Sequence, residues 1–331
     1  MNFKTLLMSG ATALALLAAP AVHAEAVKLR MGSATADAET DVYKIAYREL
    51  TKALDEMAPG QFEVSFFPNR QLGDEKEMVQ GLQLGVLDLA AITNSVVANT
   101  VPEFVVNDLP FLYANQQTAA RVLDGELGDD LLATLDSKGI VGLAFCEAGY
   151  RHMLNNIKPV HTPEDVIDAK YRVMQSPIFI GMFESLKGNP VPMAWGDTIT
   201  AFQQGAIDGL EVPAWVVAGA NLDEVAKYMS LTRHVYSAAP LMMSKASFNK
   251  LSAEQQDVIR KAAKQACATQ RERGAAQEAE IIANLKSGGK IAINDVEEAA
   301  PFRKAMQPVY EQYRDKIGSD RLDAWLSAVQ E

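Results

Sequence analysis

Two arginines lie in or beside runs that otherwise look like buried strands. Arg172 is embedded in the run AKYRVMQ, residues 169–175, and Arg151 follows the strand-like run that contains Cys146. A guanidinium group among apolar side chains is costly unless its five N–H donors find acceptors. A ligand carboxylate satisfies them with a planar two-point contact, and an internal ion pair with one of the 42 acidic residues is the alternative for either arginine. The chemistry that these residues allow is recognition of a small organic anion.

The motifs of the common enzyme classes do not occur in the sequence. It has no Gly-x-Gly-x-x-Gly, P-loop, Gly-x-Ser-x-Gly, His-Glu-x-x-His or Cys-x-x-Cys pattern. His152, His161 and His234 are scattered, and none has a second histidine or cysteine at helical spacing. A Cys146–His152 pair is conceivable, but nothing in the sequence around Cys146 activates its thiol. We therefore predict no enzyme activity, no catalytic residue, no metal and no cofactor.

The first 24 residues have the pattern of a secretory signal peptide. A lysine precedes an interrupted apolar run, and the small residues Val22 and Ala24 stand before Glu25. The apolar run is short for a membrane span, so a permanent anchor is the less favoured alternative. We expect cleavage after Ala24 and a soluble, exported mature chain that begins at Glu25.

Length and charge limit the classes of partner. A chain of 331 residues is long enough for two domains or one large one. Its formal net charge of −11 argues against nucleic acid and anionic membranes as partners. The acidic total does not argue against a small anionic ligand, because a few buried arginines set the local field.

The sequence does not decide whether Cys146 and Cys267 form a disulfide or remain free thiols. Cys146 lies in a strand-like run and Cys267 in a helical run. An exported protein permits a disulfide between them, and two buried free thiols fit the pattern equally well.

Strand-like runs alternate with helical periodicities along the chain. Phe62, Val64 and Phe66 alternate on one face of a strand, and a preceding helical pattern runs from Asp41 to the break at residues 59–60. This alternation predicts an α/β fold with a mostly parallel sheet and helices on its faces. The predicted strands are 27–33, 61–68, 86–93, 139–145, 169–175 and 206–212.

One helical pattern is unusually long. It covers residues 253–285 and begins with the capping-box sequence Ser252-Ala253-Glu254-Gln255. A helix of this length spans roughly 50 Å at about 1.5 Å per residue, which exceeds one small domain. We expect it to brace two α/β units, with a bend at Gly274 as the alternative to a straight helix.

A short pattern occurs twice, in GLQLGVLDLAAITNS (81–95) and AFQQGAIDGLEVPAW (201–215). Both copies predict a helix that ends at a glycine, followed by a strand that begins near Asp88 or Asp208. Ligands bind outside the carboxyl ends of strands in parallel α/β sheets, so the two strand ends are expected to face one cleft. Chance reuse of a common turn is the alternative.

The segment from 169 to 213, with YRV, NPVPM and AIDGLEVP, resembles the solute-binding proteins of tripartite ATP-independent periplasmic (TRAP) transporters, in the dicarboxylate-binding-protein family. The segments 66–90, 107–113 and 231–244 are also similar to this family, and the long helix is a family trait. Matching segments in the same order along nearly the whole mature chain make the resemblance specific.

The resemblance implies a two-lobe periplasmic binding protein fold, with a cleft that closes on a small organic acid. It further implies a monomer that delivers this acid to TRAP-type membrane permease subunits driven by an ion gradient. The expected lobes are residues 25–148 plus about 238–277 and residues 149–237 plus about 278–331. An exported enzyme that uses the same cleft and a ligand-sensing partner of a membrane receptor are the alternatives.

The resemblance also implies a set of site residues. Arg172 matches the arginine that grips the ligand carboxylate, and Arg151 matches a second arginine found in sialic-acid-type members. Trp195 matches an aromatic residue of the pocket wall, and Glu75 matches an acidic residue of the cleft. The remaining residues of the predicted ligand site are Thr93, Asn94, Glu211, Val212 and Tyr236.

Val212 departs from the family pattern, which often has asparagine at this position. A valine cannot hydrogen-bond a ligand hydroxyl, and Leu210 and Trp195 are expected nearby. This predicts an apolar wall that disfavours heavily hydroxylated ligands and prefers a shorter or less substituted organic acid. Alternatively, Val212 faces away from the cleft and Asn94 or Tyr236 takes over the polar contact.

Overall fold

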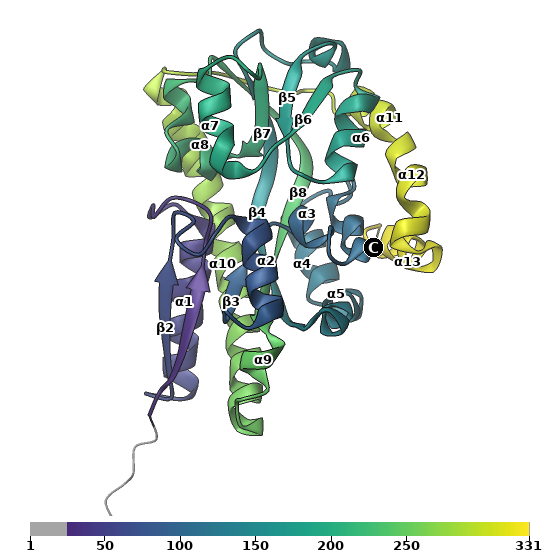
Figure 1. Ribbon diagram of the computed structural model, residues 1–331. Coiled ribbons are helices and arrows are strands. Elements are labelled where there is room, and N and C mark those ends of the chain that lie inside the picture. Colours follow the sequence, from purple (N-terminus) through teal and green to yellow (C-terminus); the bar gives the residue numbers. More distant parts are fainter. Residues whose placement is uncertain (1–24, 331) are drawn as a thin grey trace, which may run out of the picture.

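The computed structural model describes residues 25–330, so the predicted signal peptide, residues 1–24, lies outside the described residues. A single nine-stranded sheet runs through the molecule in the order β2-β1-β3-β8-β4-β7-β5-β6, and β9 pairs with β8 (Figure 1). The strands are β1 (Val27–Gly32), β2 (Phe62–Phe67), β3 (Leu89–Ala91), β4 (Ile140–Asn155), β5 (Lys170–Val173), β6 (Asn189–Pro192), β7 (Gly209–Pro213), β8 (Tyr228–Ser244) and β9 (Ala292–Asp295).

Helices cover both faces of this sheet, as the alternating pattern predicts. None of the helices between residues 25 and 330 is both long enough and apolar enough to cross a membrane. The helices are α1 (Val42–Met57), α2 (Glu75–Leu84), α3 (Asn94–Val97), α4 (Gln116–Leu123), α5 (Glu126–Ala133), α6 (Pro177–Ser185), α7 (Trp195–Gln203), α8 (Ala214–Gly219), α9 (Lys245–Phe248), α10 (Ala253–Gly288), α11 (Ala300–Met306), α12 (Pro308–Ile317) and α13 (Ser319–Ala328).

The sheet has two outer groups of parallel strands. β1 pairs with β2 and β3 in the lower half of Figure 1, and β5 pairs with β6 and β7 in the upper half. We call the first group with α1, α2 and α3 the lower half, and the second group with α6, α7 and α8 the upper half. Each half is the α/β unit that its sequence pattern predicts.

The two halves are joined by β4 and β8, which are much longer than the other strands. They run antiparallel to each other, β4 is antiparallel to β7, and β8 is antiparallel to β3. The prediction of a mostly parallel sheet therefore holds for the outer groups and is wrong at the centre. The chain enters the upper half along β4 and returns along β8, which forces these two strands into opposite directions.

β4 is also longer than predicted. The expected strand ended at residue 145, whereas β4 continues to Asn155 and includes Arg151. Residues 140–155 are buried almost throughout, because β4 lies between β8 and β7 and is covered on both faces. A central strand of this kind has no simple apolar–polar alternation to mark its end.

The long helix is confirmed as α10, with 36 residues and no interruption at Gly274. Ser252 and Gln255 form the predicted capping box at its start. The helix packs against α1 in the lower half, β4 at the centre and α8 in the upper half, as a brace must. A Cβ atom on Gly274 would lie 2.8 Å from Oε1 of Glu147, so a larger residue at this position would require the Glu147 side chain to move.

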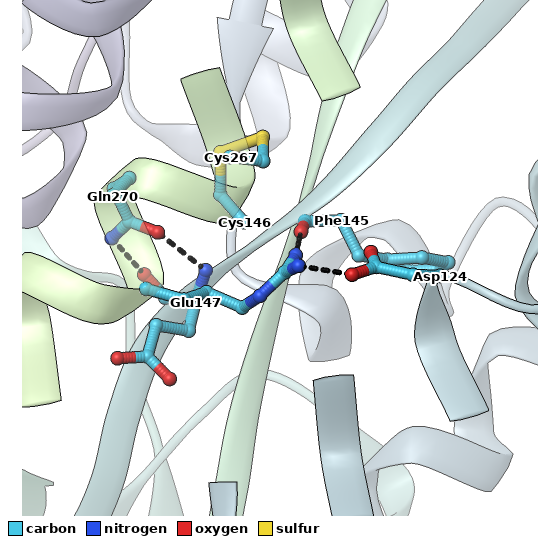
Figure 2. The surroundings of a disulfide bond; sticks show 7 residues. Asp124, Phe145, Cys146, Glu147, Cys267 and Gln270 are labelled. Atoms are coloured by element: carbon cyan, nitrogen blue, oxygen red, sulfur yellow. Dashed lines mark hydrogen bonds and ion pairs between the residues drawn. A yellow bond between two sulfur atoms is a disulfide. The ribbon is translucent and has the colours of Figure 1, made fainter. Parts of the chain in front are cut away.

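A disulfide fixes this helix to the sheet. Cys146 on β4 and Cys267 on α10 are bonded across 121 residues of sequence, which decides between the two alternatives that the sequence leaves open. Figure 2 shows Gln270 beside this disulfide, where its side chain bonds both the N–H and the carbonyl oxygen of Glu147 at 3.0 and 2.8 Å. Arg271 adds contacts with the carbonyl oxygen of Phe145 and with Asp124.

The repeated sequence pattern has the same structural role in both halves. Gly85 and Gly205 end their helices with φ angles of 72° and 70°, which favour glycine. Asp88 then accepts a hydrogen bond from the N–H of Arg30 at 2.9 Å, and Asp208 accepts one from the N–H of Lys170 at 2.8 Å. Each copy thereby ties its own strand to a neighbouring parallel strand.

Candidate functional site

A cavity lies between the two halves, where the predicted carboxyl ends of β3 and β7 meet. The lower half supplies the side chains of Tyr43, Glu75 and Thr93, and β4 supplies Arg151. Its volume is about 40 Å³, which is small beside the roughly 300–1,000 Å³ typical of ligand pockets. The upper half supplies Arg172, Met174, Trp195, Val212, Trp215 and Val216.

Arg172 enters this cavity from β5 and is only 2% exposed. Its Nε and Nη2 atoms donate to the carbonyl oxygen of Met193 at 2.9 and 2.6 Å, and Nη1 lies 3.5 Å from the sulfur of Met174. The guanidinium carbon is 6.0 Å from the centre of the Trp195 ring. No carboxylate between residues 25 and 330 forms an ion pair with Arg172, so its charge is not neutralised by the protein.

The electrostatics of Arg172 reflect this lack of a partner. Burial lowers the pKa of Arg172 to about 10, an effect that Glu211 opposes and the nearby charge of Arg151 reinforces. The side chain is still a cation at neutral pH, held in a site where its charge is unfavourable. An anion in the cavity would relieve this cost and use the donors that Met193 leaves unoccupied.

Arg151 is buried to the same degree but has an internal partner. Its Nε and Nη2 atoms bind the two carboxylate oxygens of Glu211, and Nη2 also donates to the carbonyl oxygen of Glu211 at 2.7 Å. Nε2 of His234 lies 3.6 Å from the same carboxylate. Burial alone would lower the pKa of Arg151, but Glu211 raises it above the usual value. Arg151 therefore reaches the cavity as part of an ion pair.

Glu75, Thr93 and Tyr43 form a chain of hydrogen bonds on the lower wall. The N–H and hydroxyl of Thr93 donate to Oε1 of Glu75 at 2.8 and 2.7 Å. The hydroxyl of Tyr43 lies 2.9 Å from that of Thr93, and it must be the donor because the Thr93 proton is already committed to Glu75. Burial raises the pKa of the Glu75 carboxyl, although both bonds from Thr93 oppose this shift. This wall offers the cavity polar oxygen atoms.

The opposite wall is apolar. Val212 is 2% exposed and lines the cavity, in agreement with the prediction that it faces the cleft. Trp215 stands beside it and donates its indole N–H to the carbonyl oxygen of Ala148 at 2.6 Å, so only its ring is presented. The ring of Tyr43 meets that of Trp215 edge-on, with centroids 5.6 Å apart.

Three of the predicted site residues do not line the cavity. Asn94 is buried, donates to the carbonyl oxygen of Phe104 at 2.8 Å and supports the fold of the lower half. Tyr236 donates to Glu147 at 2.8 Å on another part of the β4–β8 pair. Glu211 lies behind Arg151 as its partner. Neither Asn94 nor Tyr236 lines the cavity that Val212 lines, and the side chains of both are bonded elsewhere.

Sequence reasoning missed Tyr43 and Trp215. Tyr43 stands near the start of an amphipathic helix, where an aromatic residue reads as core. Trp215 follows the β7 strand closely, and an aromatic residue at such a position more often fills a core than lines a pocket. Ligands bind outside the carboxyl ends of strands in α/β sheets. This rule points to Trp215 as a site residue, because Trp215 lies within two residues of the carboxyl end of β7.

Two hydrogen bonds join the halves beside the cavity. The N–H of Gly196 donates to Asp74 at 3.0 Å, and the side chain of Asn99 donates to the carbonyl oxygen of Gln175 at 2.8 Å. Asp74 and Asn99 belong to the lower half, and their partners belong to the upper half. These contacts link the two halves directly. Between residues 25 and 330, no group of three or more His, Cys, Asp or Glu side chains is placed to hold a metal ion.

Comparison with known proteins gives consistent matches over most of the chain. The family described as bacterial extracellular solute-binding protein, family 7, matches residues 32–316. The 2,3-diketo-L-gulonate-binding periplasmic protein YiaO of Escherichia coli K12 is 34% identical over 304 residues, which cover 92% of this chain and 88% of the relative.

Two solved structures illustrate the structural similarity. A TRAP periplasmic solute-binding protein from Bordetella bronchispeptica, with bound density assigned to pantoate, is 35% identical with a TM-score of 0.86, over 90% of this chain and 98% of that chain. A TRAP periplasmic solute-binding protein from Polaromonas sp. JS666, bound to D-erythronate, is 33% identical with a TM-score of 0.86, over 91% and 98% of the two chains.

Proposed function

Because the chain belongs to the TRAP periplasmic solute-binding proteins, a family of binding proteins and not of enzymes, we propose that it captures a compact organic acid and delivers it to a TRAP-type membrane permease. The acid occupies the cavity between the two halves. Its carboxylate meets Arg172, and its less polar side faces Val212 and Trp215.

The observation that carries this proposal is the state of Arg172. It is a buried cation at a cavity wall with two neutral acceptors and no carboxylate partner. A protein that needed this arginine only for stability would gain by placing an acid beside it, as it does for Arg151. An unneutralised buried arginine is therefore best explained by an anionic ligand.

The walls of the cavity favour a short acid. The similar proteins from Bordetella and Polaromonas hold pantoate and D-erythronate, and both are four-carbon-chain hydroxy acids. Pantoate also carries two methyl groups, which suit the apolar surface of Val212 and Trp215. The E. coli relative is named for a more oxygenated six-carbon acid at a similar identity, so identity alone does not select the ligand. The apolar wall supplies the preference.

The proposed capture includes closure of two lobes. The lobes are residues 25–148 plus about 238–277 and residues 149–237 plus about 278–331, with α10 as the brace. The bonds from Gly196 to Asp74 and from Asn99 to Gln175 support this proposal, because they join the two halves and would have to break on opening. Small-angle scattering with and without ligand tests this point. A radius of gyration that does not fall at saturation contradicts closure.

The proposed site of action is the periplasm, after removal of residues 1–24. The family is periplasmic, and the sequence before Glu25 has the signal-peptide pattern. Intact-mass analysis of protein purified from a periplasmic extract should give a chain that begins at Glu25. A mass that includes residues 1–24 contradicts this proposal.

A thermal-shift screen tests the proposed ligand class. We expect pantoate, D-erythronate or a related short acid to raise the melting temperature, and a nonulosonic acid to have little effect. A ligand at about 100 times its Kd adds roughly 2.7 kcal/mol to the free energy of unfolding. The Arg172→Ala protein should show no shift with the same acid. Equal stabilisation of both proteins, or no stabilisation by any organic acid, would contradict the proposal.

A further inference from the structure

A second, larger cavity lies on the other side of the β4–β8 pair. Its volume is about 460 Å³, and Tyr150 of β4 lines it. Arg151, the next residue on β4, lines the ligand cavity instead. Consecutive side chains of a strand point to opposite faces, so the two cavities are separated by the strands that join the halves. We call the larger one the back cavity.

The walls of the back cavity come from different parts of the chain. Residues 111–117 include the segment before α4 and its first two residues, residues 231–233 belong to β8, and α10 contributes residues 275–282. Residues 296–303 close it from α11 and the segment before it. The aromatic rings of Phe111, Tyr113 and Tyr150 give the cavity flat apolar surfaces.

Two arginines reach this cavity without a carboxylate partner. Arg233 and Arg303 are exposed at its walls, and neither forms an ion pair with any residue from 25 to 330. The guanidinium carbon of Arg303 lies 5.4 Å from the centre of the Phe111 ring. The acidic residue of the cavity, Glu278, is placed 3.3 Å from Nε2 of His152 and bonds neither arginine. Two cations therefore share a pocket with aromatic walls in an otherwise acidic protein.

The backbone at Arg233 supports a role for its side chain. Its φ angle is 45°, a conformation that non-glycine residues adopt at a cost. The β4–β8 pairing is interrupted at this point, with Arg151 opposite Val235 and Met153 opposite Ser230. The extra β8 residues form a bulge, and bulges redirect side chains near functional sites. Here the bulged segment lines the back cavity with Leu231, Thr232 and Arg233.

We propose that the back cavity is a second binding site, for a compact organic anion with an aromatic or branched apolar body. Arg233 and Arg303 hold the carboxylate or phosphate group of this anion, and the rings of Phe111 and Tyr150 contact its body. The site differs from the ligand cavity in volume, in its lining residues and in the face of β4 that it uses.

The second site has a consequence that rests on the proposed function. Residues 111–117 follow the lower half, whereas residues 296–303 pack with α6 of the upper half through α11. Because the back cavity lies on the opposite face of β4 and β8 from the ligand cavity, we infer that rotation which opens the ligand cavity about these strands brings the two segments together and shrinks the back cavity. An anion bound there therefore favours the closed form and raises the affinity for the primary ligand.

Ligand-observed NMR with benzoate and phenyl phosphate as probes tests the second site. The Arg172→Ala protein is used, so that the probes do not bind through Arg172. We expect saturation transfer to both anions, and binding that weakens roughly tenfold with Arg233→Gln or Arg303→Gln. Lys304→Gln is the matched control. It removes one positive charge next to Arg303 in the sequence, and Lys304 does not line the cavity.

The same experiment can overturn the second site. No saturation transfer to either anion contradicts it, and so does binding that is as strong after Arg233→Gln or Arg303→Gln as in the Arg172→Ala protein without them. Neutral benzamide must bind much more weakly than benzoate. Equal binding of the two compounds shows only apolar adsorption and also contradicts the site.

Calorimetry on the unmodified protein tests the coupling. The affinity for D-erythronate or pantoate, whichever binds, should rise about fivefold or more when phenyl phosphate saturates the back cavity. An unchanged affinity would overturn the coupling. Failure of every short acid to bind would count against the proposed function. It would not affect the test of the back cavity, because the NMR experiment uses the Arg172→Ala protein and needs no primary ligand.

Discussion

Arg151 and Arg172 are two buried arginines at the same cavity, and the protein treats their charges differently. Arg151 lies on β4 and Arg172 on β5, with β7 between these strands. Glu211 on β7 points to Arg151 and neutralises it, whereas Arg172 receives only a backbone carbonyl group and a sulfur atom. Their exposed fractions are 3% and 2%, so burial does not distinguish them.

The difference between the two arginines appears in their pKa values. It indicates how the protein keeps one buried cation available for a ligand. Burial acts on both arginines, but Glu211 raises the pKa of Arg151 above its usual value, and burial lowers the pKa of Arg172 to about 10. The first arginine stabilises the junction of β4 and β7. The second is left with donors and positive charge that the protein does not use. Four predictions test this division, from the largest expected effect to the smallest.

Arg151→Ala should destabilise the fold. The substitution leaves the carboxylate of Glu211 buried without its partner, and breaking a buried pair in this way costs about 3–5 kcal/mol. Urea unfolding followed by circular dichroism measures the change. Arg48→Ala is the control, because Arg48 and Glu39 form an exposed pair that contributes little. A loss for Arg151→Ala no greater than that for Arg48→Ala would contradict the structural role.

Arg172→Ala should weaken binding strongly while the fold is retained. Loss of one partner of a buried charge pair costs about 2–5 kcal/mol, which is roughly thirtyfold or more in affinity. The free energy of unfolding should not fall as it does for Arg151→Ala, because no buried carboxylate loses its partner. Arg172→Lys should also bind poorly, since an ammonium group lacks the planar fork of donors. Calorimetry with the acid found in the screen measures the affinity of both variants. Normal binding by a folded Arg172→Ala protein would refute the proposed role of Arg172.

Val212→Asn should change which acids bind. An amide in the apolar wall adds polar atoms that a short acid leaves without partners, at a cost of about 1–3 kcal/mol. Hydroxylated analogues should bind relatively better than they do to the unmodified protein. Val86→Asn is the control, because Val86 is exposed on the lower half. The measurement is a set of dissociation constants for pantoate, erythronate and a hexuronate. If the ratios of these constants are the same for the variant and the unmodified protein, Val212 does not select the ligand.

Asn99→Ala should have the smallest effect. It removes the bond to the carbonyl oxygen of Gln175 that joins the two halves, and one neutral hydrogen bond contributes about 0.5–1.5 kcal/mol. Binding should weaken roughly two- to tenfold, mainly through faster dissociation of the ligand. Surface plasmon resonance can separate the two rates. A change confined to the association rate would argue that this contact does not hold the closed form.

Much of the fold follows from local sequence signals. The apolar spacing in α1, the capping box of α10 and the glycines that end α2 and α7 act within a few residues, so the chain specifies these elements directly. The directions of β4 and β8 do not follow from such signals. Both strands are buried on two faces, and an apolar run carries no information about the direction of its neighbours.

The candidate site divides in the same way. An arginine inside an apolar run is visible in sequence, and Arg172 and Arg151 were both singled out on that basis or by resemblance. Which of them has an internal partner depends on the placement of Glu211, which lies 60 residues from Arg151 along the chain. Asn94 and Tyr236 are also predicted site residues. In the structure the side chain of Asn94 donates to the carbonyl oxygen of Phe104 and that of Tyr236 donates to Glu147, so neither side chain faces the cavity.

By itself, then, the sequence determined the alternation of helices and strands, the repeated glycine turn, the brace and the family. Each of these depends on residue types at short, regular spacing. Only the tertiary structure decided that Cys146 and Cys267 are bonded, that Val212 faces the cavity, and that Glu211 neutralises Arg151 and not Arg172. Those outcomes depend on which distant segments pack together, and the free energy of that packing is a property of the whole core.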